Sequence, residues 1–131
     1  MKIIGIDTST DRGSVALSEN GTVIAEGLLE TRNRHSASLF SIIDRLLEES
    51  GWTRDNLDGI GVGIGPGSFT GIRVGLAGGE GMAAGLRIPL IGIVSFKAVA
   101  LASSFREGNI SVLLDARRER LYGARYLKKS N

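Results

Sequence analysis

The stretch from Gly65 to Gly85, GPGSFTGIRVGLAGGEGMAAG, restricts the possible folds more than any other part of the chain. The short apolar run at 60–64 precedes it and predicts a buried strand. A Gly-Pro-Gly turn and then a helical spacing of apolar residues follow, so the order is strand, glycine turn and helix. Ser68 and Thr70 are candidate N-caps of this helix, where free backbone N–H groups can hold an anion.

The predicted helix at 70–86 is unusually rich in glycine, and each glycine inside a helix costs about 0.5–1 kcal/mol relative to alanine. Tertiary contacts must therefore stabilise it. Gly71, Gly75, Gly79 and Ala83 recur every four residues and form a smooth face that another backbone can approach closely. Charged residues interrupt the segment, which favours close packing in a soluble protein over a membrane helix.

The composition of the 131-residue chain is that of an ordinary globular protein with room for one core. Its net charge of +2 predicts no strong affinity for polyanions. It contains no cysteine, which excludes disulfides and thiolate metal sites. We find neither a signal peptide nor an uncharged apolar run of membrane-spanning length, so we expect a cytoplasmic protein without a membrane partner.

The hydrophobic pattern predicts an α/β fold with one mixed five-stranded sheet flanked by helices. Asn20-Gly21 is a strong hairpin signal, so the first three strands should form an antiparallel meander. A helix at 35–50 carries an apolar stripe wider than one sheet contact needs, so we expect a second apolar partner on its flank. The five strands are predicted at 2–7, 13–19, 22–29, 60–64 and 89–94.

A new hairpin is predicted after Gly108. Its first strand, at 110–114, ends in Asp115, and a charged turn leads to a paired strand at 121–127. The opening of the chain has the same order of strand, acid, turn and strand. We therefore interpret this hairpin as the start of a second lobe that the chain does not complete. The predicted division is a first lobe at 1–107 and the start of the second lobe at 108–131.

Two polar turns are candidates for binding an anion or a nucleotide. In the turn that follows the first strand, hydroxyls and backbone N–H groups can cradle a phosphate while the acid lies near a metal; the alternative is an ordinary polar β-turn. The glycine turn lacks the lysine of a P-loop, but an anion-binding or backbone-recognition role remains open. The candidate residues are Asp7, Thr8, Ser9, Thr10, Gly65, Gly67, Ser68 and Thr70.

His35 is the only histidine, so a zinc site has no second imidazole ligand. A catalytic triad of Ser36, His35 and Asp44 fails because adjacent residues on a helix do not face each other. We therefore predict no catalytic residue and no metal site in this chain, and interpret His35 as a residue at the start of a helix.

The chain resembles the TsaB family, also called YeaZ, whose members take part in making threonylcarbamoyladenosine in transfer RNA. GPGSFTGIR is highly specific to that family, whereas DTST is shared with the wider superfamily of actin, sugar kinases and Hsp70. The resemblance implies an actin-like (ASKHA), RNase H-like fold with two lobes, and family members usually continue well past residue 131. It rests on IIGIDTST (3–10), RHSASLF (34–40), the stretch 65–96, and DARRERLYGARY (115–126).

The resemblance also implies a non-catalytic assembly subunit that binds a paralogous, metal-binding catalytic subunit, TsaD. The contact would use the helices at 35–50 and 70–86, which also form homodimers in the family, and transfer RNA would be contacted only indirectly through the complex. No cofactor is firmly implied; the one candidate is ATP or ADP with magnesium at a shared subunit interface. The expected interface residues are His35, Ser36, Leu39, Ile43, Leu46, Gly71, Arg73, Gly75, Leu76, Gly79 and Ala83.

The alternative function is that of an actin-fold ATPase or phosphotransferase, which Asp7 and the two phosphate-loop-like turns would support. That activity needs an adenosine pocket in a second lobe. A peptidase has no chemical support, because the paired metal-binding histidines of the catalytic paralogue are absent from this sequence.

Overall fold

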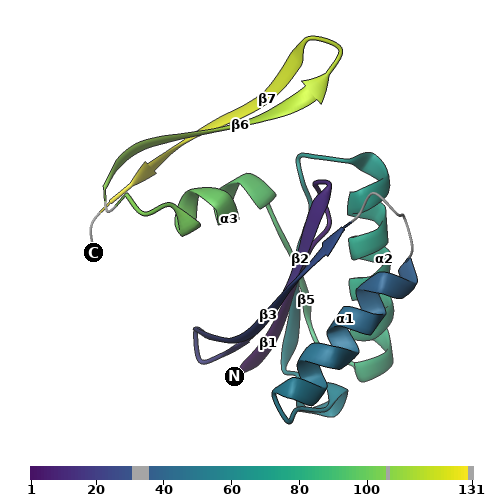
Figure 1. Ribbon diagram of the computed structural model, residues 1–131. Coiled ribbons are helices and arrows are strands. Elements are labelled where there is room, and N and C mark those ends of the chain that lie inside the picture. Colours follow the sequence, from purple (N-terminus) through teal and green to yellow (C-terminus); the bar gives the residue numbers. More distant parts are fainter. Residues whose placement is uncertain (31–35, 106, 130–131) are drawn as a thin grey trace.

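A five-stranded mixed sheet forms the centre of the computed structural model, which describes residues 1–30, 36–105 and 107–129 (Figure 1). The strand order is β3-β2-β1-β4-β5. The first three strands are antiparallel, as the hairpin signals predicted. β4 and β5 join them in the predicted mixed sheet and run parallel to β1. The strands are β1 (Lys2–Asp7), β2 (Arg12–Glu19), β3 (Thr22–Glu30), β4 (Gly59–Gly63) and β5 (Leu90–Ile93).

Two helices, α1 (Ser36–Glu49) and α2 (Phe69–Leu86), lie side by side on one face of the sheet (Figure 1). Both were predicted to within one residue at each end. A short 3-10 helix, η2 (Arg54–Asn56), connects α1 to β4. Although α2 has 18 residues, no helix in the described part of the chain is long and apolar enough to cross a membrane.

The apolar stripe of α1 is wide because it contacts two neighbours within the chain. Ile42 and Leu46 approach β3 at Gly27, while Leu39 and Phe40 approach α2 at Gly78. The second apolar partner expected for this stripe is therefore α2 itself.

The glycine face of α2 packs against the sheet of the same chain. A Cβ atom added at Gly75 would lie 2.4 Å from Thr8 Oγ1, and one at Gly71 would lie 2.0 Å from the Thr8 carbonyl oxygen. A Cβ at Gly79 would lie 3.2 Å from a methyl group of Leu90. The expectation that this face is open to another subunit is therefore wrong, because the sheet already occupies it.

Six of the expected partner residues are buried in the interior of this chain. Three are on the sheet-facing side of α1 and three on the sheet-facing side of α2, so they stabilise the fold and are not accessible to a partner. These residues are Leu39, Ile43, Leu46, Gly75, Gly79 and Ala83.

A third helix, α3 (Ser95–Ala102), follows β5 and leads into the hairpin of β6 (Gly108–Arg117) and β7 (Arg120–Lys128). These strands form a separate two-stranded sheet that runs from the end of α3 back toward the β1–β2 turn and the start of α2 (Figure 1). Phe96 and Ala100 of α3 form a second small apolar cluster with the hairpin. The buried side of α3 therefore packs against the hairpin. The lobe boundary between residues 107 and 108 stays a prediction.

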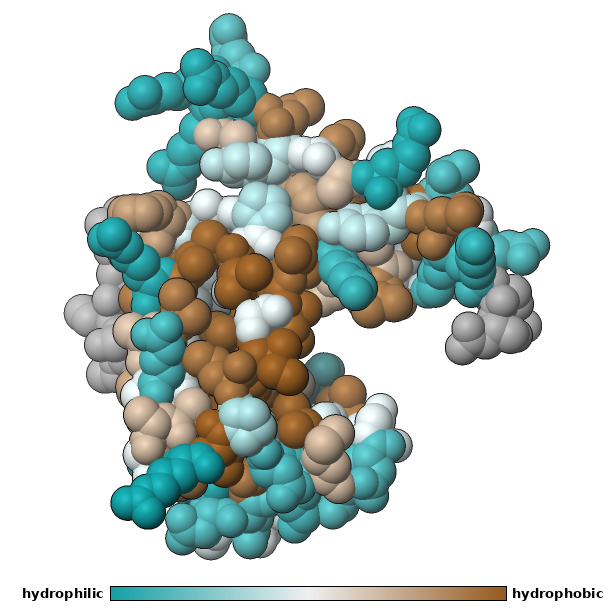
Figure 2. Space-filling view, turned by 180° about the vertical axis from the view of Figure 1, so that it is seen from behind, coloured by the Kyte–Doolittle hydropathy of each residue, from teal (hydrophilic) through white to brown (hydrophobic). Residues whose placement is uncertain are grey.

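The edge strand β5 leaves large apolar side chains exposed. Ile91 is 64% exposed and Ile93 is 42% exposed. Seen from behind, apolar side chains gather in the middle of the molecule (Figure 2). This side lacks the helical cover that α1 and α2 give to the other face of the sheet.

Candidate functional site

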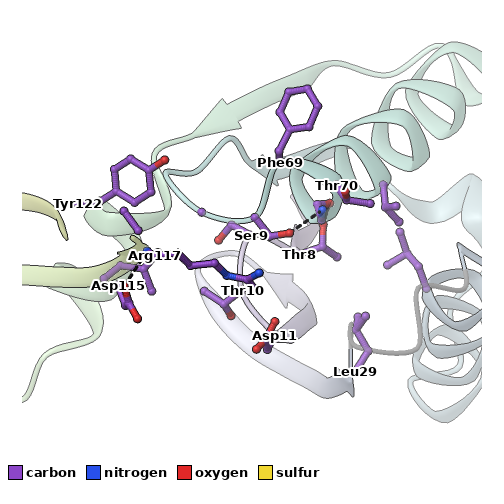
Figure 3. Close-up of a pocket in the computed structure, with 17 residues that line it drawn as sticks. Thr8, Ser9, Thr10, Asp11, Leu29, Phe69, Thr70, Asp115, Arg117 and Tyr122 are labelled. Atoms are coloured by element: carbon purple, nitrogen blue, oxygen red, sulfur yellow. Dashed lines mark hydrogen bonds between the residues drawn. The ribbon is translucent and has the colours of Figure 1, made fainter. Parts of the chain in front are cut away.

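A cleft of about 840 Å³ lies where the β1–β2 turn, the start of α2 and the β6–β7 hairpin meet (Figure 3). It brings together six of the eight predicted anion-binding residues from two separate parts of the sequence. These six are Thr8, Ser9, Thr10, Gly67, Ser68 and Thr70.

One hydrogen bond closes the turn after β1, and two more join this turn to the start of α2. The Asp7 carboxylate accepts from the backbone N–H of Ser9 at 2.8 Å, which closes the turn. The Ser9 carbonyl accepts from the N–H of Ser68 at 2.6 Å, and Thr8 Oγ1 donates to the Gly71 carbonyl at 2.6 Å. Thr8 and Ser9 are almost fully buried, so this wall of the cleft is tightly packed against α2.

The start of α2 approaches this turn closely because of its glycines. A Cβ at Gly67 would lie 2.1 Å from the Ser9 carbonyl oxygen, so no larger residue fits without movement of the backbone. Ser68 is the N-cap, and its side chain accepts from the N–H of Gly71 at 3.2 Å. Thr70 is not a cap; it lies in the first turn of the helix and lines the cleft.

Two of the predicted site residues do not line the cleft. Gly65, with φ of +88°, donates its N–H to Ser95 Oγ at 3.2 Å and accepts from the Ser95 N–H at 2.8 Å. It therefore joins the end of β4 to the start of α3. The Asp7 carboxylate lies against Gly63, where an added Cβ would be within 2.3 Å of it, so its role is to close the turn.

The hairpin contributes a second turn of the same kind on the opposite wall. The Asp115 carboxylate accepts from the N–H of Arg117 at 2.7 Å, which matches the contact between Asp7 and Ser9. The side chain of Arg117 reaches from the hairpin toward Thr10 (Figure 3). The repeated order of strand, acid and turn was the sequence signal for this wall.

The other lining residues were not predicted to bind an anion or a nucleotide, although Leu39 and Gly71 were expected at the partner interface. The repeated acidic turn was the sequence signal for Asp115, Ala116 and Arg117, whereas most of the others are apolar and no local motif distinguished them. These other lining residues are Asp11, Leu29, Leu39, Phe69, Gly71, Val74, Leu114, Asp115, Ala116, Arg117 and Tyr122.

The cleft combines hydroxyl groups and one guanidinium group with two carboxylates. Hydroxyls and the Arg117 side chain suit a phosphate or another oxyanion, whereas Asp11 and Asp115 oppose a bare anion unless a cation accompanies it. Among the residues that the structure describes, no group of three or more His, Cys, Asp and Glu side chains is placed to hold a metal ion.

The outer side of α2 is a second candidate site, because it is exposed and its residues are mostly small. Arg73, Ala77, Gly81 and Ala84 are all exposed, and a Cβ at Gly81 would meet nothing within 4 Å. The Arg73 guanidinium stacks 4.0 Å from the ring centre of Phe69. We call these four residues the outer stripe of α2.

The remaining expected interface residues lie in different parts of the two helices. Leu76 is half-buried at the margin of the outer stripe. Ser36 is the first residue of α1, and His35 lies outside the described residues.

The sequence matches the family model TsaD, tRNA N6-adenosine threonylcarbamoyltransferase, over residues 27–131. It is 35% identical to the tRNA threonylcarbamoyladenosine biosynthesis protein TsaB of Escherichia coli (strain K12), over 100% of this chain and 57% of that protein. The structure resembles YeaZ from Pseudomonas aeruginosa with a TM-score of 0.86 and 27% identity, over 98% of this chain and 61% of that one. The chain belongs to the TsaD-type family, among its TsaB/YeaZ members.

The TsaB/YeaZ resemblance stated from the motifs is therefore confirmed. The chain spans little more than half the length of the TsaB and YeaZ proteins that it matches. The ethanolamine utilization protein EutJ from Carboxydothermus hydrogenoformans shares the fold at a TM-score of 0.52 and 17% identity, over 99% of this chain and 52% of that one. Together with the mixed five-stranded sheet, these likenesses confirm the predicted actin-like, ASKHA-type fold.

Proposed function

We propose that this chain acts in threonylcarbamoyladenosine formation on transfer RNA, as a non-catalytic subunit that binds a paralogous catalytic subunit of the TsaD type. The name of the TsaB relative from Escherichia coli supports the pathway. The match to the TsaD model supports the partner, since related chains of one fold can pair through equivalent surfaces in the manner of a two-fold dimer. We propose the cytoplasm as the compartment.

The single observation that carries the partner site is the exposed outer stripe of α2. Its three small residues, Ala77, Gly81 and Ala84, leave the helix backbone accessible, and the half-buried Phe40 of α1 lies beside α2. A second helix pair could pack closely here, which the buried glycine face cannot allow. A homodimer would use the same surface and would therefore compete with the catalytic paralogue.

The experiment changes Ala77 to arginine, which places a long charged side chain on the outer stripe. The matched control is Ala98→Arg, since Ala98 is an exposed alanine on α3. We expect Ala77→Arg to weaken binding to the purified catalytic paralogue by about tenfold or more, because hot-spot disruption at the centre of an interface has this size. Calorimetry measures the affinity and circular dichroism checks the fold. Unchanged affinity in a folded variant would show that the partner binds elsewhere.

The alternative is an actin-fold ATPase or phosphotransferase, favoured by the two matching aspartate turns on opposite walls of the cleft. Titration of the isolated chain with ATP and magnesium separates the two functions. Tight binding that depends on Ser9 and Arg117 would favour the phosphotransferase. Under the main proposal the isolated chain binds the nucleotide weakly, and ATP or ADP with magnesium is held only at the interface with the catalytic paralogue.

A further inference from the structure

The charges of this chain are unevenly distributed between its two sheets. Residues 108–129 hold six of the 16 lysines and arginines but only two of the 14 aspartates and glutamates. The net charge of +2 therefore combines a basic hairpin with a slightly acidic remainder. A charge asymmetry of this kind is typical of contact with nucleic acid, and the net charge alone does not reveal it.

The tip of the hairpin carries three arginines within four residues. Arg117, Arg118 and Arg120 are exposed, and none forms a salt bridge with another described residue. Arg117 and Arg120 are cross-strand partners in the register of β6 and β7. Like charges directly opposite each other destabilise a hairpin, so this tip has a cost that a binding partner of opposite charge would offset.

The backbone conformation of the turn also destabilises the hairpin. Arg118 and Glu119 have φ of 52° and 59°, as in a type I′ turn, where asparagine and glycine are the preferred residues. The sequence thus places long charged side chains where small turn residues would stabilise the hairpin more. Violations of local preference concentrate at functional positions.

Tyr122 adds an aromatic surface next to the arginines. Its side chain is 44% exposed, and together with Arg118 and Arg120 it lines a hollow of about 450 Å³ at the tip. Guanidinium groups match phosphate in a two-point geometry, and exposed aromatic rings stack on unpaired bases. The hairpin turn projects from the body in Figure 1, and hydrophilic side chains extend from the same end of the molecule in Figure 2.

We propose that the tip of the β6–β7 hairpin, formed by Arg118, Arg120 and Tyr122, is a contact site for the phosphate backbone of RNA. The inference rests on the proposed function above, under which the RNA is the transfer RNA substrate. It replaces the expectation that transfer RNA is contacted only through other subunits. Arg117 also lines the hollow at the tip, but its side chain reaches toward Thr10 in the cleft, so it is left unchanged in the test.

The test measures binding of fluorescently labelled, unmodified transfer RNA to the chain by anisotropy over a range of salt concentrations. The variant combines Arg118→Asn with Arg120→Gln, and asparagine tolerates the left-handed backbone at position 118. The control combines Arg45→Gln with Arg54→Gln, which removes two positive charges from the surface around α1 and η2. Thermal unfolding verifies that both variants fold.

We expect the tip variant to bind transfer RNA about tenfold more weakly at low salt. The slope of log affinity against log salt should fall by about 1.4–1.8, as two lost phosphate contacts predict, whereas the control should keep both the slope and the affinity. If the control variant lost as much affinity for transfer RNA as the tip variant, net charge alone would explain the effect, and the proposed site would be overturned. A wild-type chain that does not bind transfer RNA at low salt, or that prefers polyglutamate, would also overturn it, the latter in favour of an acidic protein partner.

Binding to the catalytic paralogue separates this inference from the proposed function. The tip variant should bind the paralogue as the wild type does, while Ala77→Arg should keep its affinity for RNA. Loss of paralogue binding in the tip variant would assign the arginines to the protein interface and overturn the RNA site.

Discussion

At the scale of single residues, the glycines at and around α2 fall into two groups with opposite roles. Those facing the sheet, Gly67, Gly71 and Gly75, let the helix approach the Thr8–Ser9 turn closely, since any Cβ there would overlap its atoms. Those on the outer side, Gly81 and Gly85, face open space. The first group is therefore required by the fold, and the second leaves the backbone accessible to a partner.

Replacing a glycine from each group by alanine should change the free energy of unfolding in opposite directions. Gly75→Ala should lower the free energy of unfolding by roughly 1–3 kcal/mol, because the new methyl group displaces Thr8 Oγ1 from its bond to Gly71. Gly81→Ala should raise it by about 0.5–1 kcal/mol through helix propensity alone. Urea unfolding measures both, and a stabilising Gly75→Ala would contradict the close packing of α2 on the turn.

At the scale of elements, α1 has one face committed to the core and one face exposed to solvent. Its buried face contacts both the sheet and α2, so truncation of a large side chain there leaves a cavity between three elements. On the exposed face, Arg45 and Glu49 form a salt bridge at 3.0 Å, four residues apart. Exposed pairs of this kind contribute little to stability.

Substitutions at the neighbouring positions 45 and 46 of α1 should therefore lower the free energy of unfolding by very different amounts. Leu46 is 1% exposed, so Leu46→Ala should destabilise by roughly 2–5 kcal/mol. Arg45→Ala should stay within about 0.5 kcal/mol, because its half-exposed side chain forms a surface pair with Glu49 and only skirts β3 at Gly27. The measurement is again urea unfolding, and similar costs for the two variants would mean that the faces of α1 are assigned wrongly.

At the scale of the whole molecule, the hairpin is attached to the rest of the chain through α3. Besides the small apolar cluster, the ammonium group of Lys128 donates to the carbonyls of Leu101 at 3.0 Å and Ser103 at 2.9 Å. A positive charge there also suits the negative end of the α3 dipole. The position of one wall of the cleft consequently depends on these contacts.

Loss of the Lys128 side chain should loosen the hairpin without unfolding the five-stranded sheet. In Lys128→Ala we expect amide hydrogen exchange to become several-fold faster in β6 and β7, because the hydrogen bonds to the end of α3 are lost. Exchange in β1 and β2 should stay unchanged. Lys129→Ala is the matched control, since Lys129 is exposed. Equal exchange in both variants would show that Lys128 does not hold the hairpin.

Local patterns in the sequence were sufficient to predict the order, type and approximate bounds of the elements. Alternating apolar residues and the Asn20-Gly21 turn indicated the meander, and Ser68, the N-cap of α2, was one of the two predicted cap candidates. These features depend on residues that are neighbours in the sequence, so their physics is local. The two acidic turns of the cleft were recognisable for the same reason.

Only the tertiary structure decided which side of each helix is free and which residues share the cleft. The glycine face of α2 predicted close packing correctly. The sequence pattern is the same, however, whether the approaching backbone belongs to a partner subunit or to the chain's own sheet. The choice depends on contacts such as that between Thr8 and Gly71, which are 63 residues apart. Likewise, Arg117 and Tyr122 meet the Thr8–Ser9 turn only because α3 directs the hairpin back over the sheet. Such long-range contacts depend on the packing of whole elements, which no single segment encodes.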